Sequence, residues 1–214
     1  MQTVILLLST KAFSTRHFLL NSDTVIISDD AREKGYELSI DAFNQLKSAG
    51  QLENVHLCIV GDGPNRKMLE ERAKKNRNYI HFTGFRDDLV SVYSATDVLL
   101  APTRHDSYCS GESFGYSVVE AMACQCNVIV AACGAMPEIL GGSGCDGLIY
   151  GRSTDAWADA MNKFVYVSSE DRKLMGARLR EWVVANFEES ARMRDVVKAI
   201  LHYPVSEEVT INPA

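Results

Sequence analysis

The sequence alternates short apolar runs of strand length with longer amphipathic segments of helical length. Six apolar runs follow one another: Thr24–Ser28, Val55–Val60, Tyr79–Phe82, Asp97–Ala101, Asn127–Ala131 and Gly147–Tyr150. The segments between them favour helices at Gly35–Ala49, Asn65–Lys75, Asp87–Ala95 and Phe114–Cys124. Runs that are apolar throughout are typical of parallel strands covered on both faces. The pattern therefore predicts an α/β fold, a doubly wound parallel sheet of about six strands between Thr24 and Tyr150.

The two ends of the chain differ from this middle part. Three helices without intervening strands are predicted at Trp157–Val167, Asp171–Asn186 and Ser190–Leu201. Val4–Leu8 is strand-like and Ser14–Leu20 favours a short helix, but neither has an evident partner in the sheet. We therefore expect a main domain over residues 24–202, a separate leading piece over residues 1–23 and a frayed polar tail over residues 203–214.

Charge and cysteine content narrow the class of protein. The net charge of -6 and the pI of about 5.4 argue against an extended nucleic-acid surface. No apolar stretch approaches the ~20 residues of a membrane span. The six cysteines include no Cys-x-x-Cys pair, and a zinc site built from Cys124, Cys126 and Cys133 would lack its second half. Free thiols in a reducing cytoplasm are the expected state.

Two carboxylates stand eight positions apart, at Glu112 and Glu120, around the dipeptide Phe114-Gly115. If a helix begins near Gly115, its free N–H groups and positive dipole end form an anion site. Glu120 then lies beside the docked anion, where hydroxyl groups are natural partners for it. A nucleotide ribose diphosphate carries both groups. The alternative interpretation is a surface helix with two solvated acids.

Five segments in one order carry a family resemblance. They are Arg32-Glu-Lys-Gly35, Ile59-Val-Gly-Asp-Gly-Pro64, Phe82-Thr-Gly-Phe85, Glu112-x7-Glu120 with Ala121-Met-Ala-Cys124, and Pro137-Glu138-Ile139. From Thr24 to about Ile200 the chain resembles the carboxy-terminal, donor-binding domain of the retaining GT-B glycosyltransferases. This group includes glycogen, sucrose and lipopolysaccharide sugar transferases. The resemblance implies a Rossmann-like half of a GT-B fold with carboxy-terminal helices.

The resemblance also implies roles for single residues. Lys34 is expected to bind the diphosphate. The family arginine before it is replaced by Ser28-Asp29-Asp30, and whether nearby Arg32 takes its place stays open. The turn after the third strand is expected to lie against the nucleobase, through Gly84, Phe85 and Arg86. Gly61-Asp62-Gly63, in contrast, is expected to be only a tight turn, with Pro64 starting a helix.

The Glu112–Glu120 segment carries the remaining roles. By resemblance, Glu112 lies near the donor sugar as the catalytic candidate, and Glu120 accepts hydrogen bonds from the ribose hydroxyls. The donor-binding set is completed by Ser113, Phe114, Gly115 and Tyr116. The sequence contains no Asp-x-Asp, so we expect no metal and no cofactor besides the nucleotide-diphosphate sugar, with positive charge and helix dipoles in place of a metal.

The expected function is retaining transfer of a hexosyl group from a nucleotide-diphosphate sugar to a glycan, lipid or small molecule. The acceptor half of such enzymes is not recognisable, so we expect the chain to be incomplete and inactive alone. A separate acceptor-domain subunit is an expected partner, and any peripheral membrane association would come through that missing half. A non-catalytic nucleotide-sugar-binding module, or subunit of a split enzyme, is the alternative. A nucleotide-sugar epimerase and a dinucleotide oxidoreductase have less support, because a catalytic set and a complete Gly-x-Gly-x-x-Gly are missing.

Overall fold

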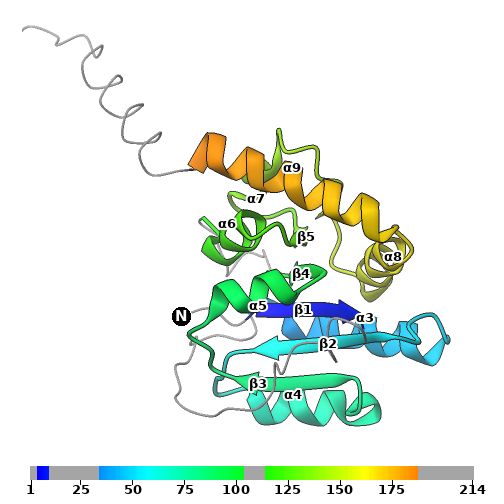
Figure 1. The fold of residues 1–214 in the computed structure, drawn as a ribbon. Helices are drawn as coiled ribbons and strands as arrows, with labels where there is room; N and C mark the ends of the chain where they lie inside the picture. The colour runs from blue at the N-terminus through cyan, green and yellow to red at the C-terminus, as the bar shows by residue number, and fades with distance from the viewer. Residues whose placement is uncertain (1–3, 10–33, 104–113, 188–214) are drawn as a thin grey trace, which may run out of the picture.

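The computed structural model describes residues 4–9, 34–103 and 114–187, which form one sheet with helices packed on both faces (Figure 1). The strands are β1 (Val4–Ser9), β2 (Val55–Val60), β3 (Ile80–Gly84), β4 (Val98–Ala101), β5 (Asn127–Ala131) and β6 (Leu148–Ile149). The helices are α3 (Tyr36–Ser48), α4 (Arg66–Ala73), η1 (Lys74–Asn76), α5 (Leu89–Ala95), α6 (Tyr116–Ala123), α7 (Met136–Leu140), α8 (Thr154–Val165) and α9 (Ser169–Phe187). This arrangement confirms the predicted α/β class.

The strand order across the sheet is β3-β2-β1-β4-β5-β6. β2 pairs with β3 in parallel, as do β4 with β5 and β5 with β6. β1 is antiparallel to both of its neighbours, with Leu6 opposite Cys58 on one side and Leu99 on the other. The described strands between Thr24 and Tyr150 therefore all run in the same direction, as predicted, and the antiparallel strand is β1, which the prediction did not include in the sheet.

β1 also departs from the expected division of the chain. The predicted strand character of Val4–Leu8 is confirmed, but this segment lies between β2 and β4 and does not stand apart from the sheet. Its run of five leucine, isoleucine and valine residues is the pattern expected for a central strand of a covered sheet. The origin of residues 1–23 in an acceptor domain stays a prediction. The predicted strand Thr24–Ser28 and helix Ser190–Leu201 lie outside the described residues.

The sheet separates two apolar clusters. Alternate side chains of each strand point to opposite faces, so Leu57, Leu100 and Ile129 join the cluster under α3, α4 and α8. Their neighbours Cys58, Leu99 and Val130 join the cluster under α5, α6, α7 and α9. Figure 1 shows α9, coloured orange, running along α6 and α7 on this second face. The doubly wound arrangement leaves the loops at the strand ends available for a site.

Helix positions follow the predicted segments closely, with two differences. α7 was not predicted as a helix, because its five residues are too short for a periodic pattern. α8 begins three residues before the predicted Trp157, because the Ser153 side chain accepts a hydrogen bond from the Ala156 N–H and caps the helix. The sequence Ser153-Thr154-Asp155 carried that signal.

No helix of the described residues is long and apolar enough to cross a lipid bilayer. The cysteines in the described ranges (Cys58, Cys124, Cys126, Cys133 and Cys145) are free thiols. Burial raises the pKa of Cys58 to about 12, so this thiol stays protonated inside the sheet.

Two histidines form a pair at the amino-terminal ends of β2 and β3. The Nδ1 atom of His56 lies 2.9 Å from the Nε2 atom of His81, and the ring centroids are 5.2 Å apart. Burial, and then the charge of His56, lowers the pKa of His81 to about 4. The pKa of His56 is also lowered, by burial and then by Lys47. The pair is therefore neutral near pH 7.

This pair should make the fold sensitive to acid. An unfolded histidine titrates near pH 6.5, so between that pH and about 4 the unfolded chain binds a proton that folded His81 does not. Stability should fall by roughly 2–3 kcal/mol as the pH drops from about 7 to about 4. The measurement is urea unfolding at both pH values for the native chain and for His81→Leu. The variant should lose less stability on acidification than the native chain; equal losses would exclude His81 as the sensitive group.

Candidate functional site

The carboxyl ends of β3, β4 and β5 and the starts of α3 and α6 frame the candidate site. Gly35, at the start of α3, lines a small cavity of about 110 Å³ together with Pro102 and Thr103, which follow β4, and Ala131 at the end of β5. These loops meet at the sheet edge where doubly wound folds bind ligands.

α6 begins at a glycine in a left-handed conformation. Gly115, the N-cap residue, has φ 71° and ψ 55° and has no side chain with which to cap the helix. A left-handed backbone strains residues that carry a Cβ, so glycine fits this position. The Gly115 carbonyl accepts hydrogen bonds from the Val118 and Val119 N–H groups, so the helix starts here and its positive dipole end lies at this turn. The predicted helix start near Gly115 is confirmed.

α3 begins in the same way. The N-cap residue is again a glycine without a capping side chain, Gly35, with φ 67° and ψ 24°. Lys34, half-buried, directly precedes this glycine. A lysine next to a helix start adds its positive charge to that of the helix dipole.

Two aromatic rings flank the start of α6. The Phe114 and Tyr116 rings lie 4.8 Å apart between centroids, and Phe114 also contacts Phe187 of α9 at 6.0 Å. The Phe114 ring is half-buried, whereas 66% of Tyr116 is exposed. Phe114 therefore anchors the turn to the second apolar cluster, and Tyr116 presents a ring to solvent.

Glu120 lies on the exposed side of α6, one turn beyond its first residue. One carboxylate oxygen, Oε2, accepts a hydrogen bond of 3.1 Å from the hydroxyl group of Tyr93 on α5. Tyr93 is almost fully buried, and this burial, followed by the charge of Glu120, raises its pKa. The hydroxyl therefore stays protonated and orients the carboxylate, while the exposed side chain keeps acceptor positions toward solvent.

Tyr93 is a site residue that the sequence did not indicate. It stands 27 positions before Glu120 and occupies a buried position of α5, where its pattern is that of a core residue. Only the placement of α5 beside α6 brings the hydroxyl to the carboxylate.

The loop after β3 holds the predicted base-binding residues. Gly84 has φ 71°, and Phe85 and Arg86 are half-buried. The Arg86 guanidinium makes two hydrogen bonds of 2.7 Å to the carboxylate of Asp88, through Nε and Nη2. This bidentate pair lowers the pKa of Asp88. Because Asp88 engages both of these nitrogens, the backbone and Phe85 are the better-placed base contacts in this loop.

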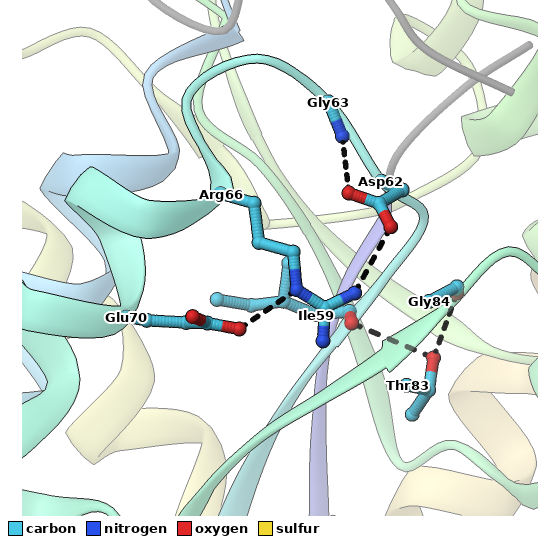
Figure 2. Close-up of polar contacts among 7 residues, drawn as sticks. All are labelled: Ile59, Asp62, Gly63, Arg66, Glu70, Thr83 and Gly84. Carbon is cyan, nitrogen blue, oxygen red and sulfur yellow. Dashed lines mark hydrogen bonds and ion pairs between the residues drawn. The ribbon is translucent and has the colours of Figure 1, made fainter. Parts of the chain in front are cut away.

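The loop between β2 and α4 pairs with the end of β3 through Gly61 and Gly84. The Gly61 N–H donates to the Gly84 carbonyl at 2.7 Å. Arg66 bridges two carboxylates, with Nη1 3.1 Å from Asp62 Oδ2 and Nε 2.7 Å from Glu70 Oε1, as Figure 2 shows. These contacts, that to Glu70 first, raise the pKa of Arg66.

The predicted turn at Gly61 is thereby confirmed, since its φ is 124°. α4 begins at Arg66 and not at the expected Pro64. The fastened loop gives the Gly84–Arg86 turn a rigid support on one side.

Three predicted site residues lie outside the described residues: Arg32, Glu112 and Ser113. Of the others, the structure brings Lys34, Phe114, Gly115 and Tyr116 to the helix starts, Gly84, Phe85 and Arg86 to the β3 turn, and Glu120 to the exposed side of α6. Their roles in donor binding stay predictions.

Comparisons with known proteins agree with this arrangement. The family model described as glycosyl transferases group 1 matches residues 23–166. The chain is 31% identical over 180 residues to the D-inositol 3-phosphate glycosyltransferase of Corynebacterium glutamicum (strain R), covering 77% of this chain and 41% of that protein. It spans about a quarter to two-fifths of the length of the curated relatives it matches.

Solved structures show the same fold. The carboxy-terminal domain of a glycosyl transferase group 1 family protein (LpcC) from Francisella tularensis superposes with a TM-score of 0.60 at 25% identity, covering 74% of this chain and 82% of that one. Anabaena Alr3699/HepE in complex with UDP-glucose superposes with a TM-score of 0.68 at 21% identity, covering 82% of this chain and 47% of that one. With its GT-B type of fold, this chain belongs to the glycosyl transferases group 1 family.

Proposed function

We propose that these residues form the donor-binding domain of a retaining glycosyltransferase that uses a nucleotide-diphosphate sugar. The observation that carries the proposal is the start of α6, where an uncapped glycine turn and the exposed carboxylate of Glu120 share one helix. The positive dipole end of the helix suits a phosphate, and the carboxylate suits the ribose hydroxyls.

The start of α3 supports the same ligand. Lys34 and the positive dipole end of α3 at Gly35 would bind the diphosphate, and the Gly84–Arg86 turn would contact the base. Positive charge and helix dipoles offset the phosphate charge in this proposal, so it includes no metal ion.

Relatives supply the class of donor. HepE was crystallised with UDP and with UDP-glucose. A mannosyltransferase of Mycobacterium tuberculosis (strain ATCC 25177 / H37Ra) that is 36% identical over 111 residues is GDP-mannose-dependent by name. We therefore propose a uridine or guanosine diphosphate hexose, with Glu112 near the sugar.

Transfer also requires an acceptor beside the donor. Correct placement of two reactants is worth about 7–11 kcal/mol of a barrier. We propose that an acceptor-binding part outside these 214 residues supplies this placement, because the chain matches only part of each relative's length. The non-catalytic binding module stays the alternative, and sugar transfer on addition of such a part separates the two. A cytoplasmic location stays a prediction.

The test of the proposal is a thermal-shift series on the 214-residue chain with UDP, GDP, ADP and CMP, and with NAD as control. A ligand at a hundred times its Kd stabilises the folded state by about 2.7 kcal/mol. We expect UDP or GDP to raise Tm by several degrees and NAD to leave it unchanged. Stabilisation by NAD without any effect of nucleotide diphosphates would contradict the proposal.

A further inference from the structure

β1 holds the central position of the sheet, between β2 and β4, and differs from the other strands in direction (Figure 1). β2, β3, β4, β5 and β6 all run one way, and β1 is antiparallel to both of its neighbours. Val4 pairs with Val60 and Ser9 with Val55. β1 therefore begins at the carboxyl edge of the sheet, where the candidate donor site lies, and ends at the opposite edge. Because α3 starts at the carboxyl edge, the chain between Ser9 and α3 has to return across the sheet.

The helical connections indicate which kind of strand suits the central position. α4 joins β2 to β3 on the face of the sheet that also carries α3. α3 leads into β2 on this same face. Crossovers between parallel strands have one hand, so a parallel strand before α3 lies on the side of β2 that faces away from β3. That side is the central position.

Thr24–Ser28, in the sequence before α3, meets the requirements of such a strand. It is an apolar run rich in β-branched residues, which is typical of a strand covered on both faces. Only residues 29–33 separate it from Lys34, and connections of about two to six residues are usual between a strand and the next helix. The segment lies outside the described residues, but its distance from α3 fits a strand that ends at the carboxyl edge, parallel to β2.

We propose that Val4–Ser9 and Thr24–Ser28 compete for the central position, and that a bound nucleotide diphosphate favours Thr24–Ser28 as a parallel strand. The coupling rests on the proposed function, because it acts through Lys34 and the start of α3. A short connection costs less conformational entropy to fix than a long one. Lys34 is therefore held more firmly behind residues 29–33 than behind the whole of residues 10–33. β1 is thus an autoinhibitory strand, which a ligand displaces by binding the other arrangement more tightly.

Hydrogen exchange followed by mass spectrometry on the 214-residue chain tests the competition, with and without saturating UDP or GDP. Backbone amides of a central strand are hydrogen-bonded and exchange slowly. Without nucleotide, we expect slow exchange at Val4–Ser9 and fast exchange at Thr24–Ser28. Nucleotide should slow exchange at Thr24–Ser28 by about tenfold or more and speed it at Val4–Ser9, while β2 stays protected as the internal control. Bound nucleotide with no change at either segment overturns the proposal and leaves the proposed function standing.

A matched pair of variants tests the competition without nucleotide. Leu6→Lys and Ile26→Lys each put a charge into the middle of one competing strand, which a covered central position does not accept. Each single variant should keep the fold by using the other strand, and the double variant should not fold. Circular dichroism and urea unfolding measure this result. Unfolding of one single variant, with no loss of stability in the other, would show that one segment alone holds the position and would overturn the proposal.

Nucleotide affinity distinguishes the two arrangements. Leu6→Lys leaves the central position to Thr24–Ser28 and should bind UDP or GDP more tightly than the native chain. Ile26→Lys keeps β1 in place and should bind them about tenfold or more weaker than Leu6→Lys. Equal affinities of the two folded variants overturn the coupling. Absence of nucleotide binding by the native chain and both variants contradicts the proposed function instead, while the folding of the variants still decides the competition.

Discussion

Trp157→Ala is expected to lower the free energy of unfolding by about 3–5 kcal/mol. Trp157 is fully buried and is the largest of the buried side chains, packed in the cluster between α3, α8 and the sheet. Its indole Nε1 also donates a hydrogen bond of 3.3 Å to the Gly151 carbonyl. Truncation therefore removes the largest apolar contact of this face and leaves a carbonyl unpaired.

Chemical unfolding in urea measures this effect. Tyr166→Ala, just after the end of the same helix, is the matched control: 73% of Tyr166 is exposed, so its loss should change stability by no more than about 0.5 kcal/mol. The loss of stability for Trp157→Phe should lie between those for Trp157→Ala and Tyr166→Ala. If Trp157→Ala lowers the free energy of unfolding by less than about 1 kcal/mol, the packing of α8 against the sheet contributes little to stability.

Trp157→Ala should also weaken nucleotide binding at the candidate site. Trp157 lines the small cavity at the start of α3, together with Gly35 and Thr103. It therefore supports the start of this helix. A variant that still folds should bind UDP or GDP more weakly, because the helix start loses a fixed wall. The core of this face and the proposed phosphate site are thus physically continuous.

The parallel strands could be predicted from the sequence because each strand is marked by its own run of apolar residues. Val55–Val60 and Asn127–Ala131 are continuous apolar runs between turn residues, and both became strands with the predicted bounds. The direction of β1 could not be read in the same way. A run such as Val4–Ser9 fits a covered central position in either direction, because its pattern is apolar throughout.

The candidate site was predictable where a backbone requirement shows in the residue type. Gly115 and Gly84 both adopt left-handed conformations. A glycine before or within a predicted turn indicates such a conformation. Partners across the fold gave no such signal. Asp88 accepts hydrogen bonds from Arg86, but in the sequence it has the pattern of an ordinary helix cap. Tyr93 donates to Glu120, but in the sequence it has the pattern of a core residue.

Glu120→Gln is expected to weaken the binding of UDP or GDP by about tenfold or more. A hydrogen bond to a charged acceptor is worth about 1.5–3 kcal/mol, and 1.4 kcal/mol corresponds to a factor of ten in Kd. The fold should be kept, since the side chain is exposed and the glutamine oxygen can still accept from Tyr93. The loss of nucleotide affinity therefore measures the contribution of the Glu120 charge to binding of the ribose hydroxyls.

Isothermal calorimetry on the native chain and three variants tests this expectation. Glu181→Gln makes the same change on the exposed side of α9 and should bind like the native chain. Tyr93→Phe removes the donor to Glu120 without removing the carboxylate, so it should lower stability more than nucleotide affinity. A 2′,3′-dideoxynucleotide diphosphate should bind the native chain and Glu120→Gln equally, because it lacks the hydroxyls on which the carboxylate acts. Unchanged UDP and GDP affinity for Glu120→Gln would make Glu120 a solvated helix residue and leave ribose recognition to other groups.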